Sequence, residues 1–420
     1  MKVLLRAATI YSPQSSFHLQ QQNILIDKGI ITYIGADEPE ADKVVAKDGL
    51  CVSGGWIDMH AYVGEPGHEY KEDIQSIAAA ASKGGFTEVL CLPNTSPVVQ
   101  TKGAVNYLKS HSAYLPVTLH PIAAVTVDTD GKDLTEMIDL HQAGAIAFSD
   151  GIKPIQAADI ILKALQYVQL FDGLLMNKPE NTRLTEHGQM HEGITSTQLG
   201  MKGIPSLAEE VAVTRDLQLL AYAGGKMHFS LVSTAATIEA IRKAKAQGLN
   251  VTCDVASYQV SFVDVSIAPF DTNYKVAPPF RSQTDADAIK QGLADGTIDA
   301  LVSAHQPHDT EAKKLEFDLA DFGIINLETA FAVANTAFAD VLATEQLVDK
   351  FVSGPRFILG HKVPVIEVGE AANLTLFQPN QVWIPTEAET VSKGKNSPFF
   401  GKELKGRVVG TIHKGQVVLH

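Results

Sequence analysis

The two ends of the chain share an alternating pattern of apolar and polar residues. Residues 2–11 and 22–35 alternate in this way, and so do residues 372–379, 381–385 and 406–419, with Gly, Asp and Pro at the turns. A period of two bounded by such residues is typical of β-strands. The pattern predicts that both termini, residues 1–53 and 360–420, combine into one small β-sandwich domain.

The middle of the chain has a different pattern, in which short apolar segments alternate with amphipathic stretches. Eight segments are nearly continuous in apolarity, as strands buried on both faces should be; they span residues 53–60, 87–93, 116–123, 145–149, 173–177, 226–232, 250–256 and 299–305. Eight such units predict an α/β fold, a (β/α)8 TIM barrel over residues 54–359. A doubly wound open sheet is the alternative, but no G-x-G-x-x-G follows the first segment.

Composition narrows the possible functions. The formal net charge of −14 disfavours binding to nucleic acid or to an anionic membrane. Cys51, Cys91 and Cys253 stand alone in apolar contexts, which indicates buried thiols rather than disulfides or a cysteine zinc site. The apolar run at the amino end is too short for a signal peptide, and no run has the roughly 18–20 apolar residues of a membrane span. We therefore expect a cytoplasmic protein.

Polar residues gather where the eight predicted strands end. In a (β/α)8 barrel these ends share one face, where active sites lie, so the sequence predicts a pocket there. The residues concerned include Asp58, His60, Tyr62, Asn94, His120, Asp150, Asn177, Lys178, Glu180, Ser233, Tyr258, His305 and His308. The alternative is that many of them only cap helices or close turns, as Ser233-Thr234 and Asn94 would.

Several motifs occur in an order that identifies a family. The segments "DMHAYVGEPGHEYKED", "AFSDG", "NKPENTRLTEHGQMHEG", "NYKVAPPFRS" and "SAHQPHDTEAKK" follow one another over nearly the whole chain. Together they resemble the long, barrel-type dihydroorotases of the amidohydrolase superfamily. The resemblance implies a TIM barrel of the amidohydrolase type with a β-sandwich domain. It also implies one or two zinc ions that activate water for hydrolysis of the cyclic amide of dihydroorotate.

The positions that this resemblance assigns to zinc and to proton transfer are only partly retained. Asp58, His60 and Asp150 remain as possible ligands. Four expected ligand or proton-transfer positions carry other residues, namely Tyr62, Lys178, Leu231 and Ala304, and Gly64 stands where an Arg would hold the substrate. Zinc needs three or four N, S or O donors, and Leu and Ala offer none. We therefore predict that no zinc binds and that dihydroorotase activity is absent.

Other residues keep an active protein open as the alternative hypothesis. Asn94, Asn273 and His308 match substrate-contacting positions of the family, although barrel-mouth Asn and His also persist for structural reasons. Asp150, His305 and His308 are weak candidates for proton transfer, and the two His could hold a lone metal with His60. In that case the chain would be a cyclic-amide hydrolase that uses zinc.

Lys178 suggests a more specific hypothesis. Its positive charge would replace that of the metal and balance Asp58, Asp150 or Glu180, which would otherwise repel one another as like charges. If zinc and dihydroorotase activity are absent, as predicted above, we expect the chain to be a structural or regulatory partner of another protein. The resemblance then implies aspartate transcarbamoylase or an active dihydroorotase as the partner, and a homo-oligomer is expected.

Overall fold

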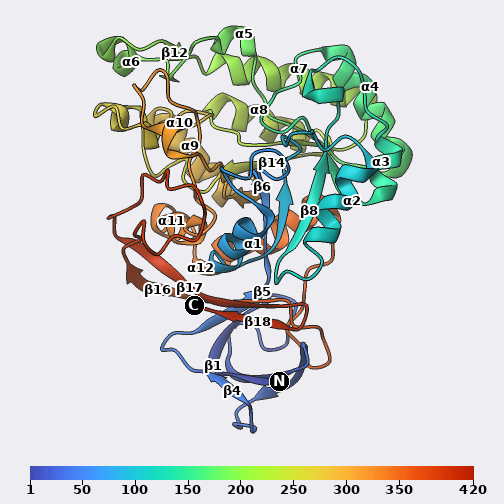
Figure 1. The fold of residues 1–420 in the computed structure, drawn as a ribbon, viewed down its shortest axis with the longest axis vertical. Coiled ribbons are helices and arrows are strands. Elements are labelled where there is room, and N and C mark those ends of the chain that lie inside the picture. Colours follow the sequence, from blue (N-terminus) through green and yellow to red (C-terminus); the bar gives the residue numbers. More distant parts are fainter.

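A sheet of eight strands forms a domain at one end of the molecule and contains both termini (Figure 1). The computed structural model describes residues 1–420. The strands follow the order β18-β17-β16-β5-β1-β2-β3, and β4 pairs with β1. Their bounds are β1 (Lys2–Tyr11), β2 (Gln21–Asp27), β3 (Ile30–Gly35), β4 (Lys43–Val45), β5 (Cys51–Gly54), β16 (Leu374–Trp383), β17 (Leu404–His413) and β18 (Gln416–Leu419). The predicted strand-rich domain built from both termini is confirmed.

The two halves of this domain share one hydrogen-bonded sheet and one core. Strands β5 and β16 pair antiparallel, with Leu374 opposite Gly54, which joins the amino-terminal strands to the carboxyl-terminal ones. The core is a cluster of 17 buried apolar residues drawn from both halves, such as Ile24 and Ile26 of β2 and Leu376 of β16. Neither half could bury this face alone, so the domain requires both ends of the chain.

The second sheet contains eight strands that run parallel in the order β15-β14-β13-β10-β9-β8-β7-β6. They are β6 (Trp56–Ala61), β7 (Phe86–Cys91), β8 (Thr118–Ala123), β9 (Ala147–Phe148), β10 (Leu175–Asn177), β13 (Met227–Phe229), β14 (Val251–Ala256) and β15 (Ala300–Val302). All eight predicted strands are present. A parallel bridge between Ala61 and His305 brings the first strand to the last, so the barrel is nearly closed.

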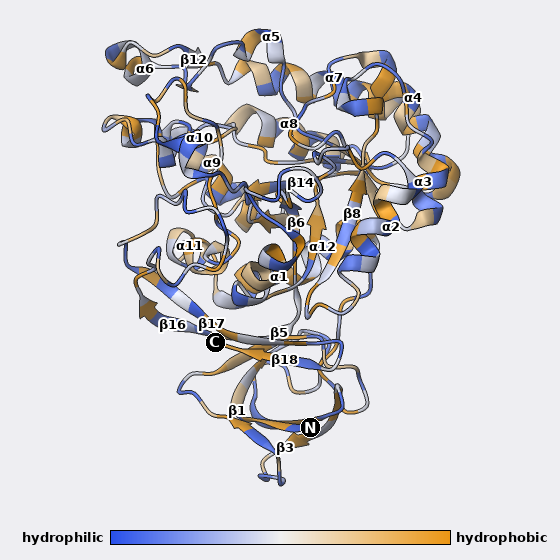
Figure 2. Cartoon of the chain, in the orientation of Figure 1, coloured by the Kyte–Doolittle hydropathy of each residue, from blue (hydrophilic) through white to orange (hydrophobic).

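Helices surround this barrel, and they differ from its strands in hydropathy. The strands inside the barrel are mostly hydrophobic, whereas the helices carry both hydrophobic and hydrophilic faces (Figure 2). The longer helices are α1 (Ile74–Lys83), α2 (Lys102–His111), α3 (Met137–Ala143), α4 (Ala158–Val168), α7 (Leu207–Ala223), α8 (Ala235–Ala246), α9 (Gln283–Ala294), α11 (Ala330–Ala337) and α12 (Thr344–Leu359). None of the helices is long and apolar enough to span a bilayer.

The first helix shows how the sequence sets these elements. Asp73 precedes α1 and accepts a hydrogen bond from the Ser76 backbone N–H, while the Ser76 hydroxyl accepts one from the Asp73 N–H. This capping box satisfies two N–H groups that the helix itself leaves free. Ile74, Ile77 and Ala81 are buried on one face, as their spacing predicts.

Three connections shape the carboxyl-terminal face of the barrel, which lies away from the β domain (Figure 1). Residues 178–206 after β10 contain α5 (Thr182–Thr185), β11 (Met190–His191), α6 (Ile194–Leu199) and β12 (Gly203–Ile204). Residues 303–329 after β15 contain α10 (Thr310–Lys313). The segment between β16 and β17 also reaches the barrel, because Asn396 accepts a hydrogen bond from the His308 backbone N–H (3.0 Å).

Candidate functional site

A cavity of about 260 Å³ opens at the carboxyl ends of the barrel strands. Its lining includes His60, Lys178, Leu231 and Ala304, which come from four different strand ends. These are four of the positions that the resemblance assigns to zinc or to proton transfer. The structure therefore brings together residues that lie up to 244 positions apart (304 − 60) in the sequence.

The first strand supplies Asp58 and His60, and only one of them is free to bind anything. The Asp58 carboxylate is fully buried and accepts hydrogen bonds from the Ser303 N–H and the Ser303 hydroxyl, both at 2.6 Å. Burial raises the pKa of Asp58 to about 6, although these hydrogen bonds oppose the rise. The His60 imidazole is buried with no partner at Nδ1. Burial, together with the nearby Lys178 charge, lowers its pKa to about 4, although the Asp254 charge opposes this shift.

Tyr62 lies beside this strand end, away from the cavity lining. Its ring stacks on His68, with ring centroids 6.4 Å apart. Burial raises the pKa of the phenol, so it stays protonated at neutral pH. A neutral, stacked phenol is a poor ligand for a metal ion.

Lys178 follows β10 and forms an ion pair within the cavity. Its ammonium Nζ lies 2.9 Å from Glu180 Oε2, and the other Glu180 oxygen accepts the Thr185 hydroxyl at 2.7 Å. Burial alone would raise the pKa of Glu180, but the charge and hydrogen bond of Lys178 outweigh it and lower the pKa. Of the three carboxylates considered for Lys178, the structure places Glu180 against it.

Leu231 and Ala304 adopt left-handed backbone conformations, with φ of 59° and 48°. Such angles are rare for a residue with a Cβ and costly for a large one such as Leu. At Leu231 the backbone N–H donates to Asp254 Oδ1 at 2.6 Å, and Asp254 Oδ2 accepts from buried His228 at 3.0 Å. The strand-end geometry is therefore held by buried hydrogen bonds, whereas the side chains of Leu231 and Ala304 pack as apolar core.

Asp150 and Asn94 organise a neighbouring loop instead of facing the cavity. The Asp150 carboxylate accepts the backbone N–H groups of Val125 (3.0 Å) and Thr126 (2.9 Å), and also the Thr126 hydroxyl. Burial raises its pKa against these bonds. The Asn94 amide donates to the Asp150 carbonyl and accepts from the Ile152 N–H. Both side chains are thus hydrogen-bonded to neighbouring loop segments and do not line the cavity.

His305 is also occupied by structural contacts. Its Nδ1 accepts the backbone N–H groups of Asn326 (3.2 Å) and Leu327 (3.3 Å), so Nε2 carries the proton. That N–H donates to Glu72 at 3.3 Å, and Glu72 in turn accepts the Ser392 hydroxyl. His305 therefore ties the barrel to the segment between β16 and β17.

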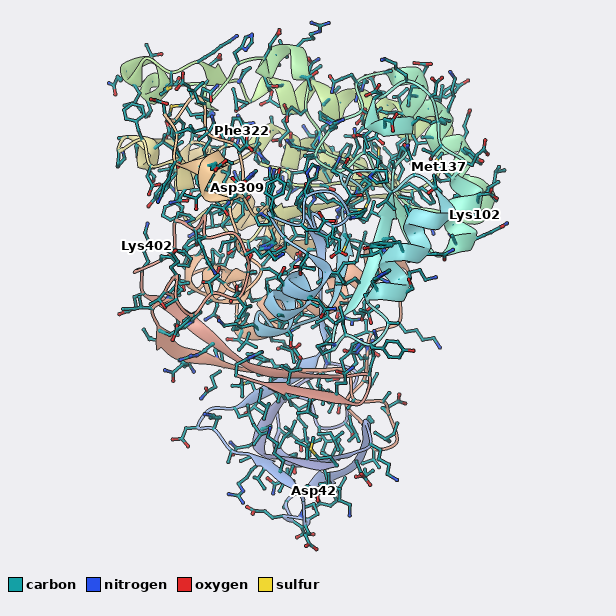
Figure 3. The ribbon with its side chains drawn as sticks, in the orientation of Figure 1. Asp42, Lys102, Met137, Asp309, Phe322 and Lys402 are labelled. Carbon is teal, nitrogen blue, oxygen red and sulfur yellow. The ribbon has the colours of Figure 1, made fainter.

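His308 and Asn273 lie at a second cavity, also of about 260 Å³, rather than beside His60. The His308 Nε2–H donates to the Phe322 carbonyl at 2.8 Å, and burial lowers the pKa of His308 to about 4. Asp309, which follows His308 and caps α10, and Phe322 are both labelled in Figure 3. Asn94, Asn273 and His308 are thus not brought together at one cavity.

The cavity beside His60 also contains residues that the strand ends did not predict. Arg281 is 4% exposed, and its Nε donates to the Ser233 hydroxyl at 3.0 Å. Glu209, on α7, accepts the backbone N–H groups of Ser233 and Thr234. Tyr258, which the strand ends did predict, contributes a buried phenol whose pKa burial raises. Arg281 could have been found from the "PPFRS" motif, but nothing in the pattern of α7 marks Glu209.

The donors present do not fit a zinc site. Among the retained residues, only His60 lines the cavity with an unpartnered donor atom. The carboxylates of Asp58 and Asp150 are bonded to backbone and hydroxyl groups, and the ammonium of Lys178 would repel a dication. No group of three or more His, Cys, Asp or Glu side chains is placed to hold a metal ion. Zinc needs at least three such donors.

Comparison with known proteins gives the family. A family model described as "Dihydro-orotase-like" matches residues 49–237. A dihydroorotase of Pelotomaculum thermopropionicum is 40% identical, and one of Syntrophus aciditrophicus is 39% identical; each comparison covers 100% of this chain and 99% of the relative.

Solved structures agree on the fold. The L-hydantoinase (dihydropyrimidinase) of Arthrobacter aurescens has a TM-score of 0.86 at 22% identity, covering 100% of this chain and 96% of the other. A dihydropyrimidinase of Brevibacillus agri has a TM-score of 0.84 at 19% identity, with 100% and 95% covered. The predicted barrel with its strand-rich domain is thereby confirmed, and the full-length similarity to the two dihydroorotases shows that this chain belongs to the dihydroorotase family.

Proposed function

We propose that this protein is a dihydroorotase-family barrel without zinc and without dihydroorotase activity, which acts as a structural or regulatory partner. One observation carries the proposal. The cavity where a metal would lie is lined by Lys178, Leu231 and Ala304 beside a single free donor, His60. A lone imidazole next to an ammonium cannot retain a dication.

The chemical consequence is the loss of an activated water. Bound zinc lowers the pKa of water to about 7, and without it hydroxide is scarce at neutral pH. No free carboxylate replaces it, because Asp58 and Asp150 are already hydrogen-bonded and Ala304 stands at the proton-transfer position. Loss of a general acid or base alone costs roughly 10²–10⁴ in rate.

The competing function is an active cyclic-amide hydrolase with an improvised metal. Its support is the 39–40% identity to proteins named dihydroorotase. Such a site would need His305 or His308 to join His60. Both ring nitrogens of His305 are committed to backbone N–H groups and Glu72, and His308 donates to a backbone carbonyl at another cavity. The geometry favours the non-catalytic function.

A non-catalytic role fits a chain that keeps the complete fold. Both domains and all eight barrel strands are present although the metal-binding positions differ. Within the pyrimidine biosynthesis family, the partners we propose are aspartate transcarbamoylase or an active dihydroorotase, with the chain itself a homo-oligomer.

Elemental analysis and a hydrolysis assay on the same purified protein test the catalytic half of the proposal. We expect zinc far below one atom per chain, and no hydrolysis of dihydroorotate above buffer even with added zinc. The dihydroorotase of Pelotomaculum thermopropionicum, assayed in parallel, serves as the active control. Stoichiometric zinc together with turnover would refute the proposal.

Co-expression tests the partner half. The tagged chain is produced with the aspartate transcarbamoylase, and separately with the active dihydroorotase, of its own organism. We expect one of them to co-elute with the chain at constant stoichiometry on size exclusion. Independent elution of all three proteins would contradict a partner role.

A further inference from the structure

Two basic side chains line the barrel cavity, while the carboxylates beside them are already bonded. Glu209 accepts the Ser233 N–H (2.8 Å), the Thr234 N–H (3.0 Å) and the Ser233 hydroxyl. Ser233 and Thr234 directly precede α8, whose positive helix end also favours the negative charge of Glu209. The hydrogen bonds of Glu209 are therefore filled by Ser233 and Thr234, and Arg281 contributes a longer ion pair without a hydrogen bond.

The Arg281 guanidinium consequently keeps an open edge. Its Nε and Nη1 donate to Ser233 and to the Ile204 carbonyl, at 3.0 and 2.9 Å. Its Nη2 lies 3.7 Å from Glu209 Oε2, which is beyond hydrogen-bonding distance. Arg281 is 4% exposed and lines the cavity. The free Nη2 edge of its guanidinium can therefore bind a group inside the cavity.

Lys178 adds a second cation with spare donors. An ammonium has three N–H groups, and the Lys178 ammonium has one ionic partner, Glu180. The cavity lining thus holds two cations, Lys178 and Arg281, and two carboxylates, Glu180 and Glu209. Both cations keep N–H groups that the carboxylates do not occupy, and these donors face the cavity.

A buried polar atom in the same cavity lacks a partner. His60 is 5% exposed, lines the cavity, and has no hydrogen bond at Nδ1. An unsatisfied buried polar group is costly, and a ligand in the cavity would relieve that cost. Tyr258, 2% exposed, presents its phenol to the same space.

The volume limits what can enter. About 260 Å³ is slightly less than the roughly 300–1,000 Å³ of pockets for drug-sized ligands. The occupant should therefore have few heavy atoms, and it should accept hydrogen bonds from ammonium, guanidinium and phenol groups.

We infer that this cavity binds a small oxyanion, a carboxylate or a phosphate, between Lys178 and Arg281. The site has the opposite polarity to a metal site at the same strand ends: it presents cations and receives an anion. The inference rests on the metal-free cavity of the proposed function.

Anion-linked stability tests it on the full-length protein after treatment with a chelator. Urea unfolding is followed at rising sodium acetate or sodium phosphate, with sodium chloride holding ionic strength constant. A ligand that binds only the folded state stabilises it in proportion to ln(1 + [L]/Kd). We expect at least one of the two anions to stabilise the wild type, and the two series show whether a carboxylate or a phosphate is preferred.

Three variants locate the binding site. Lys178→Gln should raise Kd at least about tenfold, as expected for loss of a charge-assisted hydrogen bond. Tyr258→Phe, which keeps the ring and removes only the hydroxyl, should raise it about fivefold. Lys314→Gln is the matched control, because it removes one positive charge at the second cavity and should leave Kd unchanged.

Three results would overturn the inference: no stabilisation beyond that by chloride, equal binding by Lys178→Gln, or weakening by Lys314→Gln alone. Zinc analysis of the protein before chelation separates this inference from the proposed function. Stoichiometric zinc would refute the metal-free function, whereas anion binding that survives chelation supports the site in its own right.

Discussion

The ion pair between Lys178 and Glu180 should stabilise the barrel mouth measurably. The perturbation is Lys178→Met, which keeps the unbranched apolar stem of the side chain and removes its charge. Side-chain exposures of 11% for Lys178 and 24% for Glu180, with 2.9 Å between the charged atoms, place the pair between a surface and a fully buried one. Removing one partner of a buried pair costs about 3–5 kcal/mol, whereas exposed pairs contribute about 0–1 kcal/mol.

We therefore expect Lys178→Met to lower the free energy of unfolding by about 2 kcal/mol at pH 7, since Glu180 keeps its Thr185 bond but loses its cation. A double-mutant cycle with Glu180→Gln isolates the pair itself. Lys163 and Asp159 provide the matched control: their charged atoms are a similar 2.8 Å apart, but the side chains are 59% and 65% exposed. Their coupling should be no more than about 0.5 kcal/mol.

The pH dependence has a definite sign. Lys178 lowers the pKa of Glu180 below its ordinary 4.5, despite burial, which would raise it. The unfolded chain thus binds the proton more readily, and the stabilisation is complete above pH 4.5. It is lost as the pH falls below 4.5 and through the folded-state pKa. The stability gap between wild type and Lys178→Met should shrink over the same range.

Urea unfolding at pH 7 and at pH 3 measures both effects, provided the slope of free energy against urea is unchanged. The reasoning would be refuted if the Lys178–Glu180 coupling at pH 7 were as small as that of Lys163–Asp159. If the stability difference between wild type and Lys178→Met were larger at pH 3 than at pH 7, the predicted direction of the pH dependence would be wrong.

Further predictions concern the metal, the backbone and the base of the barrel. Lys178→His alone should not bring stoichiometric zinc in elemental analysis, because the other missing donors remain absent. Ala304→Gly should leave the free energy of unfolding unchanged or raise it by up to about 1 kcal/mol, because glycine adopts the φ of 48° without strain. Ala286→Gly, equally buried but in α9, should lower it by about 1 kcal/mol. If urea unfolding showed the same loss for both variants, the backbone at Ala304 would not be strained. Glu88→Gln should cost about 3 kcal/mol at pH 7, because it leaves buried Arg356 without the carboxylate 2.8 Å away. Burial would raise the pKa of Glu88, but the pKa is nevertheless lowered to about 2. The stability that Glu88 gives the wild type should therefore be lost as the pH falls from 4.5 to 2, while the stability of the variant changes less over this range.

The sequence by itself determined the architecture. Period-two segments at both ends predicted the strand-rich domain, and eight continuous apolar segments predicted the barrel strands, because burial on one or both faces of a strand dictates where apolar residues must stand. The motifs also identified the positions that matter at the mouth, since strand ends of a barrel share one face. The resemblance to the family's motifs singled out Lys178, Leu231 and Ala304, and the structure places all three in one cavity with His60.

Only the tertiary structure decided what each polar side chain does. Asp58, Asp150 and His305 have residue types suited to a metal or to proton transfer, yet each is bonded to backbone or hydroxyl groups from distant segments. Arg281 and Glu209 entered the site without a strand-end signal, from a loop and from a helix. Local sequence fixes which groups a residue can offer. Which of them remain free depends on long-range packing, because a buried polar group binds whatever partner the fold brings to it.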